Sequence, residues 1–408
     1  MELKPILSAM RHRKTGVLLI VLQVALTLAI LANALYVVRD RMKESQRPTG
    51  VEDAVVFHIG ITDKERDTTG AVSAADLDAL RAMPGVVAAS VVNQVPLSNS
   101  GNNSGFDVKP NLDNSLTTAA TYHTSANIAD TWGLRIVEGR TFRADEELFI
   151  DEDLTGQPDP TVALVSSTMA KVLYPNETSV VGKPLYWGNT GPIEIVGVID
   201  TLVTPWGRSS WGGGDGTHSV VFAARRAGNW GTYAIRVDDP ANLQRLIRES
   251  QTMLQARVPG RMVEFASTMG ETRERRYEGE HTMINGLLIV MALLLVMTAS
   301  GIVGLASLWV NQRRKQIGVR RALGARRIDI LRLFVTENVL ITGAGALVGC
   351  ALALGLNALM MDQLELSRLP LGYLGVGSVV LLLLGFGAVL GPAFRAASVA
   401  PATATRSA

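Results

Sequence analysis

Apolar residues in this chain gather in four long runs, separated by polar segments. The runs cover residues 16–38, 283–310, 333–360 and 372–391. Each is long enough to cross a bilayer as a helix, which takes about 20 residues. The third run is the least uniform, because Glu337 and Asn338 stand near its start. The pattern predicts four transmembrane helices.

The segment between the first two runs has the pattern of a mixed α/β domain. Residues 86–92 and 193–200 are apolar and rich in β-branched side chains, which is typical of strands. A Ser-x-x-Asp signal at Ser73–Asp76 predicts the start of a helix that ends before residue 86. A second helix is predicted by apolar residues at helical spacing, namely Leu243, Leu246, Ile247 and Leu254.

The charges predict how the chain crosses the membrane, since cytoplasmic flanks of membrane helices carry excess Lys and Arg. Four basic residues precede the first run, and eight lie between residues 313 and 334 beside a single acid. Residues 39–280 instead carry a net charge of −8, against +10 for the rest of the chain. We therefore expect both termini in the cytoplasm and no need for a nucleic-acid partner. The fold class is an α-helical integral membrane protein with four transmembrane helices and a large α/β extracytoplasmic domain inserted between helices 1 and 2.

The basic start and the Ala-Asn-Ala sequence at 32–34 also fit a secretory signal peptide. The apolar stretch exceeds 20 residues, however, whereas the apolar region of a signal peptide has about 7–15. We expect an uncleaved helix.

Enzyme motifs are absent from the sequence. It contains no phosphate-binding loop, and the nearest match, at Gly182-Lys183-Pro184, lacks the other required residues. It also lacks H-E-x-x-H, C-x-x-C and G-x-S-x-G, and its one cysteine, Cys350, lies in the third apolar run. We expect no catalytic, cofactor or metal site in this chain, so chemical energy has to come from a partner.

The basic segment is more than a topological signal or a lipid-binding stretch, because apolar residues are threaded through it. Its sequence QIGVRRALGAR resembles the signature E-I-G-I-R-R-A-L-G-A of the FtsX-like permeases, the MacB/LolC/FtsX group of ABC transporters. WGLRIVEGRTF and IEIVGVIDTL resemble the MacB-type periplasmic core domain, and the resemblance covers nearly the whole chain. Gln316 departs from the pattern, since the family commonly has glutamate there.

The resemblance implies a domain organisation. Residues 1–15 form the cytoplasmic N-terminus, 39–282 the periplasmic core domain with stalk ends, 311–332 the basic cytoplasmic loop with a coupling helix, 361–371 a short periplasmic loop and 392–408 the cytoplasmic tail. The expected location is the bacterial inner membrane.

The resemblance also implies a function: the permease subunit of a MacB-like ABC exporter. ATP and Mg²⁺ bind to a separate ATPase subunit, because only about 15 residues precede the first helix. A second permease copy or a paralogue completes a dimer, and a periplasmic membrane-fusion protein with an outer-membrane channel is a further partner in some systems. The expected ATPase-coupling residues are Ile317, Val319, Arg320, Arg321, Leu323, Gly324, Ile328 and Glu337.

Two pairs of glycines at GxxxG spacing are candidates for close helix packing. They are Gly345 with Gly349 and Gly387 with Gly391.

Three other interpretations remain open. The chain could extract lipoproteins, as LolC-like permeases do, or control a cell-wall hydrolase, as FtsX-like proteins do. A membrane receptor with a sensing outer domain is the alternative from another class, and it leaves the signature segment unexplained. The sequence does not indicate the substrate.

Overall fold

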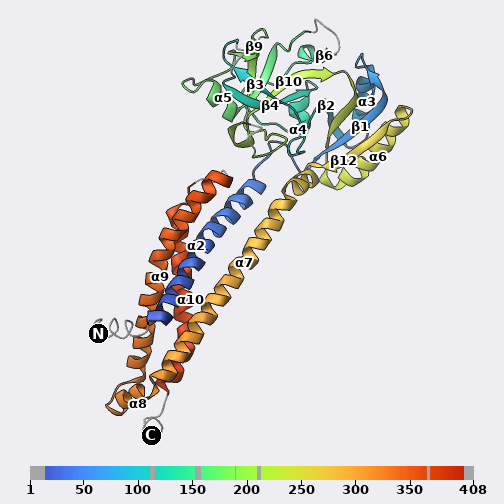
Figure 1. Ribbon diagram of the computed structural model, residues 1–408. Coiled ribbons are helices and arrows are strands. Elements are labelled where there is room, and N and C mark those ends of the chain that lie inside the picture. Colours follow the sequence, from blue (N-terminus) through green and yellow to red (C-terminus); the bar gives the residue numbers. More distant parts are fainter. Residues whose placement is uncertain are drawn as a thin grey trace. The chain divides into compact units, whose positions relative to one another are not determined.

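The computed structural model describes residues 14–110, 115–151, 158–188, 190–208, 213–364 and 368–398. The expected N-terminal segment and the end of the tail lie outside these residues. The chain forms two compact units, a helical unit (residues up to 43 and from 280 onward) and an α/β domain (44–279) (Figure 1). Both boundaries fall inside long helices, so two helices contribute to both units.

Four helices of the described chain are long and apolar enough to cross a membrane. They are α2 (Lys14–Ser45), α7 (Met269–Gln312), α9 (Arg327–Leu364) and α10 (Leu371–Ala397). A short helix, α8 (Arg314–Ala322), lies between α7 and α9. The α/β domain is inserted between the first and second long helices, so the predicted fold class is confirmed.

The four long helices of the helical unit share one apolar core. It is built from Ile20, Val24 and Leu28 of α2, Ile302 and Trp309 of α7, Ile341 and Ala346 of α9, and Leu381 of α10. Polar side chains on the helices find partners inside the unit: Thr27 and Thr298 share a hydrogen bond of 2.8 Å, and Asn33 Nδ2 donates to the Ala353 carbonyl at 3.0 Å. Such bonds are favoured where lipid offers no alternative partner.

One part of the α/β domain is an antiparallel sheet in the order β12-β1-β11-β2. Its strands are β1 (Val56–Asp67), β2 (Val86–Val92), β11 (Gly228–Val237) and β12 (Met262–Thr268). Helices α3 (Ala71–Arg81) and α6 (Leu243–Arg257) cover one face (Figure 1). The apolar residues predicted to form one face of α6 all pack in this core, so that prediction is confirmed.

The other part of the domain is a six-stranded barrel. Successive pairings run β4-β3-β8-β9-β7-β10, and β10 then pairs with β4 to close the ring. The strands are β3 (Asn103–Asp107), β4 (Thr117–Thr124), β7 (Val162–Ser166), β8 (Pro184–Trp187), β9 (Ile193–Ile199) and β10 (Ser219–Arg226). Short strands β5 (Ile136–Gly139) and β6 (Leu148–Ile150) pair with β9 and β10, and helices α4 (Ile128–Trp132) and α5 (Ser167–Leu173) pack against the strands.

Both faces of strand β10 are buried over its first six residues. Val220 and Phe222 of β10 enter one apolar cluster, whereas Val221 and Ala223 enter another. Because successive side chains of a strand point to opposite faces, β10 separates two cores. This explains why residues 220–224 are all apolar rather than alternating with polar residues.

The predicted start of α3 at Ser73 is wrong. The helix begins at Ala71, and the Asp67 carboxylate accepts hydrogen bonds from the backbone N–H groups of Gly70 and Ser73. Asp76, the other half of the expected signal, is buried and bonded to Tyr233 and Arg261. An acid nearer the true helix start satisfies the free N–H groups, so Asp76 is available to the core.

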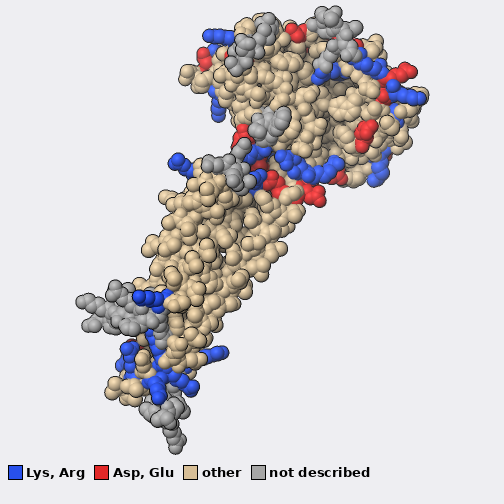
Figure 2. All heavy atoms as spheres, viewed as in Figure 1, with Lys and Arg blue, Asp and Glu red and all other residues tan. Residues whose placement is uncertain are grey.

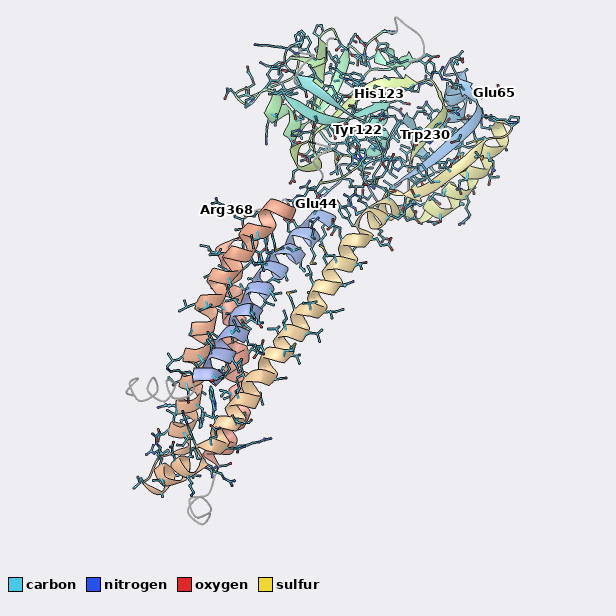
Figure 3. All side chains as sticks on the ribbon, in the orientation of Figure 1. Glu44, Glu65, Tyr122, His123, Trp230 and Arg368 are labelled. Carbon is cyan, nitrogen blue, oxygen red and sulfur yellow. The ribbon has the colours of Figure 1, made fainter. Side chains whose placement is uncertain are left out.

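Two buried histidines make the α/β domain sensitive to acid. His58 Nε2 accepts a hydrogen bond from Trp132 Nε1 at 3.0 Å, and burial lowers the pKa of His58 to about 3. His123, labelled in Figure 3, belongs to strand β4. Its ring lies against Phe222 and Trp187, and burial, with the nearby Arg226 charge, lowers the pKa of His123 to about 3 as well. Both imidazoles are therefore neutral in the folded domain.

Lowering the pH from 7 to 5 should destabilise the domain. The unfolded chain gains protons on these histidines below a pKa of about 6.5 and the folded domain does not, so stability falls by up to about 1.4 kcal/mol per histidine for each pH unit below that value. The effect is measured as a change in melting temperature, with tryptophan fluorescence as the signal for unfolding. The double variant His58→Gln/His123→Gln should melt at a temperature that depends less on pH, whereas an equal dependence in both proteins would contradict this account.

Candidate functional site

The basic segment folds as a short helix with defined ends. α7 ends at Gln312, Arg313 leaves the helical conformation, and α8 then runs to Ala322. At its end, Gly324 adopts a positive φ of 99°, and its N–H donates to the Arg321 carbonyl at 3.1 Å. Only glycine takes this backbone conformation without strain, so Gly324 closes α8 and turns the chain into α9.

One side of α8 packs inside the helical unit. Ile317 is 4% exposed and lies in a cluster with Ile330 and Phe334 of α9 and Val389 and Ala393 of α10. Ile317 was expected to contact a partner, but in this structure it holds α8 on its own chain.

The opposite side of the segment presents apolar groups to solvent. Leu323 is 82% exposed, Val319 52% and Ile328 46%, although all three are large apolar side chains. Arg320 is exposed beside them, and Arg321 is half-buried. Lys and Arg side chains gather at the end of the helical unit that carries α8 (Figure 2). Exposed apolar residues framed by cations are typical of a protein-binding surface.

An open groove of about 580 Å³ continues this surface onto α9 and α10. It is lined by Arg327, Ile328, Leu331, Phe394, Arg395, Ala397 and Ser398. Phe394 is 60% exposed, so the groove adds an aromatic side chain and two guanidinium groups to the surface around Leu323. Its α10 residues were not identified from the sequence, because they follow the coupling helix by about 70 positions.

A buried ion pair fixes the start of α8. Arg313 donates from Nη1 and Nη2 to the two carboxylate oxygens of Glu337 in α9, at 2.9 and 3.2 Å. The Glu337 side chain is 4% exposed. Glu337 was expected to take part in coupling, and the structure places it behind α8 rather than on the exposed surface. The sequence alone could have indicated that Glu337 pairs with another side chain, because an acid in an apolar span needs a cation or a hydrogen-bond donor.

The two glycine pairs lie in different surroundings. A Cβ added at Gly345 would meet Val24 Cβ at 2.8 Å, and one at Gly349 would meet the Ala25 carbonyl oxygen at 2.9 Å, so both glycines lie against α2. A Cβ at Gly387 or Gly391 would have no such neighbour within 4 Å among the described residues.

Gly349→Leu should therefore separate α2 from α9 and lower the melting temperature of the detergent-solubilised chain. Overpacking of this kind costs about 1–3 kcal/mol. Gly391→Leu is the matched control and should melt close to the unmodified protein. Equal losses in the two variants would show that the close approach to α2 is not what matters.

The fold and the site define a multi-pass membrane protein with a large inserted domain and a basic, partly apolar surface on a short helix. Residues 15–252 match the MacB-like periplasmic core domain, and residues 288–401 match the FtsX-like permease C-terminal region. The chain belongs to the family of MacB-like ABC transporter permeases.

Individual relatives carry the same resemblance. The macrolide export ATP-binding/permease protein MacB of Salmonella typhimurium is 25% identical over 59% of this chain and 35% of its own length. That of Rhodospirillum rubrum is 30% identical over 49% of this chain and 31% of its own length. The crystal structure of the periplasmic region of MacB from Actinobacillus actinomycetemcomitans covers 57% of this chain and 97% of its own, with 15% identity and a TM-score of 0.31. The chain spans about a third of the length of these curated relatives.

Proposed function

We propose that this chain is the permease subunit of a MacB-like ABC transporter, which couples ATP hydrolysis by a separate ATPase subunit to movement of its α/β domain. The observation that carries the proposal is the exposed apolar and cationic surface of Val319, Leu323 and Ile328, which lies on α8, its C-terminal turn and the start of α9. Ile317 packs against α9 and α10, so the chain itself holds α8 in place. The ATPase subunit binds ATP and Mg²⁺ and occupies this surface. Neither matched family region is an ATPase domain.

The coupling follows from continuous helices. α8 is joined to α7 at Arg313, and α7 is one helix of 44 residues whose first turns belong to the α/β domain. α7 contains no proline, which is the commonest cause of a sharp kink, so a displacement of α8 by the ATPase is transmitted along α7 to that domain. No charged pathway through the helices is needed, because the substrate is taken up from the periplasm or the outer leaflet.

The arrangement in the membrane follows from the charges. The basic surface around α8 lies in the cytoplasm with both termini, the α/β domain is periplasmic, and the membrane is the bacterial inner membrane. A second copy or a paralogue completes the transporter, and a membrane-fusion protein with an outer-membrane channel extends it where the substrate leaves the cell.

Reconstitution with an ATPase subunit encoded beside this chain tests the proposal. The two proteins should co-purify, and ATP turnover in lipid nanodiscs should exceed that of the ATPase alone. A chain that neither retains nor stimulates the ATPase would favour the receptor interpretation.

A further inference from the structure

A second pocket lies wholly within the α/β domain, where the start of α7, strand β12 and the loop after β2 meet. Its volume is about 350 Å³, within the range of small-molecule sites. It is lined by Val95, Leu97, Ser98, Asn99, Phe265, Ser267, Thr272, Arg275 and Arg276. The wall thus combines three apolar side chains with two guanidinium groups, three hydroxyls and an amide.

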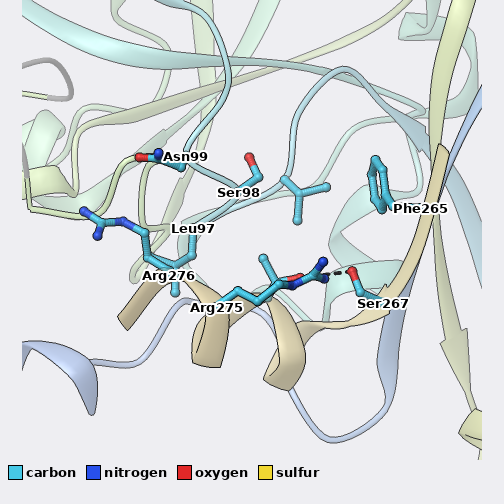
Figure 4. Close-up of a pocket in the computed structure, with 9 residues that line it drawn as sticks. Leu97, Ser98, Asn99, Phe265, Ser267, Arg275 and Arg276 are labelled. Atoms are coloured by element: carbon cyan, nitrogen blue, oxygen red, sulfur yellow. Dashed lines mark hydrogen bonds between the residues drawn. The ribbon is translucent and has the colours of Figure 1, made fainter. Parts of the chain in front are cut away.

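The two arginines have unused donors. Arg275 is exposed, and its Nε contacts only the Glu271 carbonyl of its own helix, at 3.4 Å. Arg276 donates to the Trp206 carbonyl at 2.7 Å, while its buried Nε has no hydrogen-bond partner. Among the described residues, no carboxylate lies within ion-pair distance of either guanidinium. Figure 4 shows Arg275 extending toward Ser267 and Arg276 toward Asn99.

The acids on the same helical turns, Glu271 and Glu274, lie outside the pocket lining. The Glu271 carboxylate instead accepts a hydrogen bond from the Thr268 N–H at 2.8 Å and so caps α7. No acidic residue lines the pocket, so the formal charges on its wall are those of the two guanidinium groups, beside an apolar surface.

The loop after β2, which contributes Leu97, Ser98 and Asn99 to the pocket, has a strained backbone. Leu97 and Asn99 have positive φ angles of 62° and 61°, which cost a leucine about 1–2 kcal/mol. Backbone hydrogen bonds from Leu97 to the Thr204 carbonyl (3.3 Å) and from Asn99 to the Pro205 carbonyl (2.8 Å) fix this shape. Strained residues of this kind cluster at binding sites.

We propose that this pocket binds a small organic anion with an apolar body, whose carboxylate or phosphate group pairs with Arg275 and Arg276. The apolar body lies against Val95, Leu97 and Phe265. Thr272, Arg275 and Arg276 belong to the first turns of α7. The ligand therefore contacts the helix that continues into the helical unit. The binding itself does not depend on an ATPase, so it stands or fails separately from the proposed function.

The test is isothermal titration of the full chain in lipid nanodiscs with three probes that share one ring system, namely naphthoate, naphthyl phosphate and the uncharged naphthamide. Empty nanodiscs give the blank. At least one anion should bind saturably and about tenfold or more tighter than naphthamide, as expected for a charge-assisted hydrogen bond. Which anion binds more tightly distinguishes a carboxylate ligand from a phosphate ligand.

Variants locate the binding. Arg275→Gln should weaken anion binding about tenfold or more. Arg248→Gln removes the same charge from the exposed face of α6, outside the pocket lining, and should bind as the unmodified chain does. Ser98→Phe fills the pocket without changing its charge and should abolish binding of all three probes. Melting temperatures show that each variant is folded. Equal affinity for naphthamide and the anions, or equal affinity of the Arg275→Gln and Arg248→Gln variants, overturns the proposal.

Discussion

Leu323→Asp should abolish recruitment of the ATPase and stimulation of its turnover, while the chain still inserts and folds. Leu323 is 82% exposed, so a carboxylate at this position costs the isolated chain little. In the complex the same carboxylate would be buried without a partner in an apolar contact. Anchors of this kind commonly contribute 2 kcal/mol or more, which corresponds to about a 30-fold loss of affinity.

Co-purification of the ATPase and ATP turnover in nanodiscs measure the effect. Leu116→Asp is the matched control, because Leu116 is an exposed leucine of the α/β domain and should leave coupling intact. Arg320→Ala should have a smaller effect, since exposed ion pairs contribute about 0–1 kcal/mol. Gln316→Glu restores the common family residue on the exposed side of α8 and should be tolerated. Wild-type coupling in the Leu323→Asp variant would reduce the segment to a topological signal.

The parts of the fold that are local in sequence could be predicted. The four spans follow from long apolar runs, and strand β2 from a β-branched segment, because each pattern is complete within one element. Closure of the barrel by β10 and β4 could not, since it joins strands about 100 residues apart and no local pattern encodes the pairing.

The site shows the same limit. Sequence identified the short helix and its closing glycine, because both rest on neighbouring residues. It did not distinguish the buried Ile317 from the exposed Leu323, because both are apolar and only the positions of α9 and α10 decide which side chain is covered. Phe394 and Arg395 were missed for the same reason.

The ion pair between Arg313 and Glu337 should be the most costly polar contact of the helical unit to break. Removal of one partner leaves a buried charge without compensation, which costs about 3–5 kcal/mol. Glu337→Ala should therefore lower the melting temperature of the purified chain and, by freeing the start of α8, reduce stimulation of the ATPase. Arg314→Ala, which removes an exposed neighbouring charge, is the matched control and should change neither.

A double-mutant cycle separates the pair from its surroundings. Arg313→Ala alone should also destabilise the chain, and the double variant should lose less stability than the sum of the two single variants, because no unpaired charge then remains. The melting temperature of each variant in the same detergent gives the interaction. Additive losses would mean that the two side chains act independently. Recovery of stability in the double variant without recovery of ATPase stimulation would indicate instead that the pair transmits motion from α8 to α9, since two alanines leave no unpaired charge but also make no contact that holds the two helices in one fixed geometry.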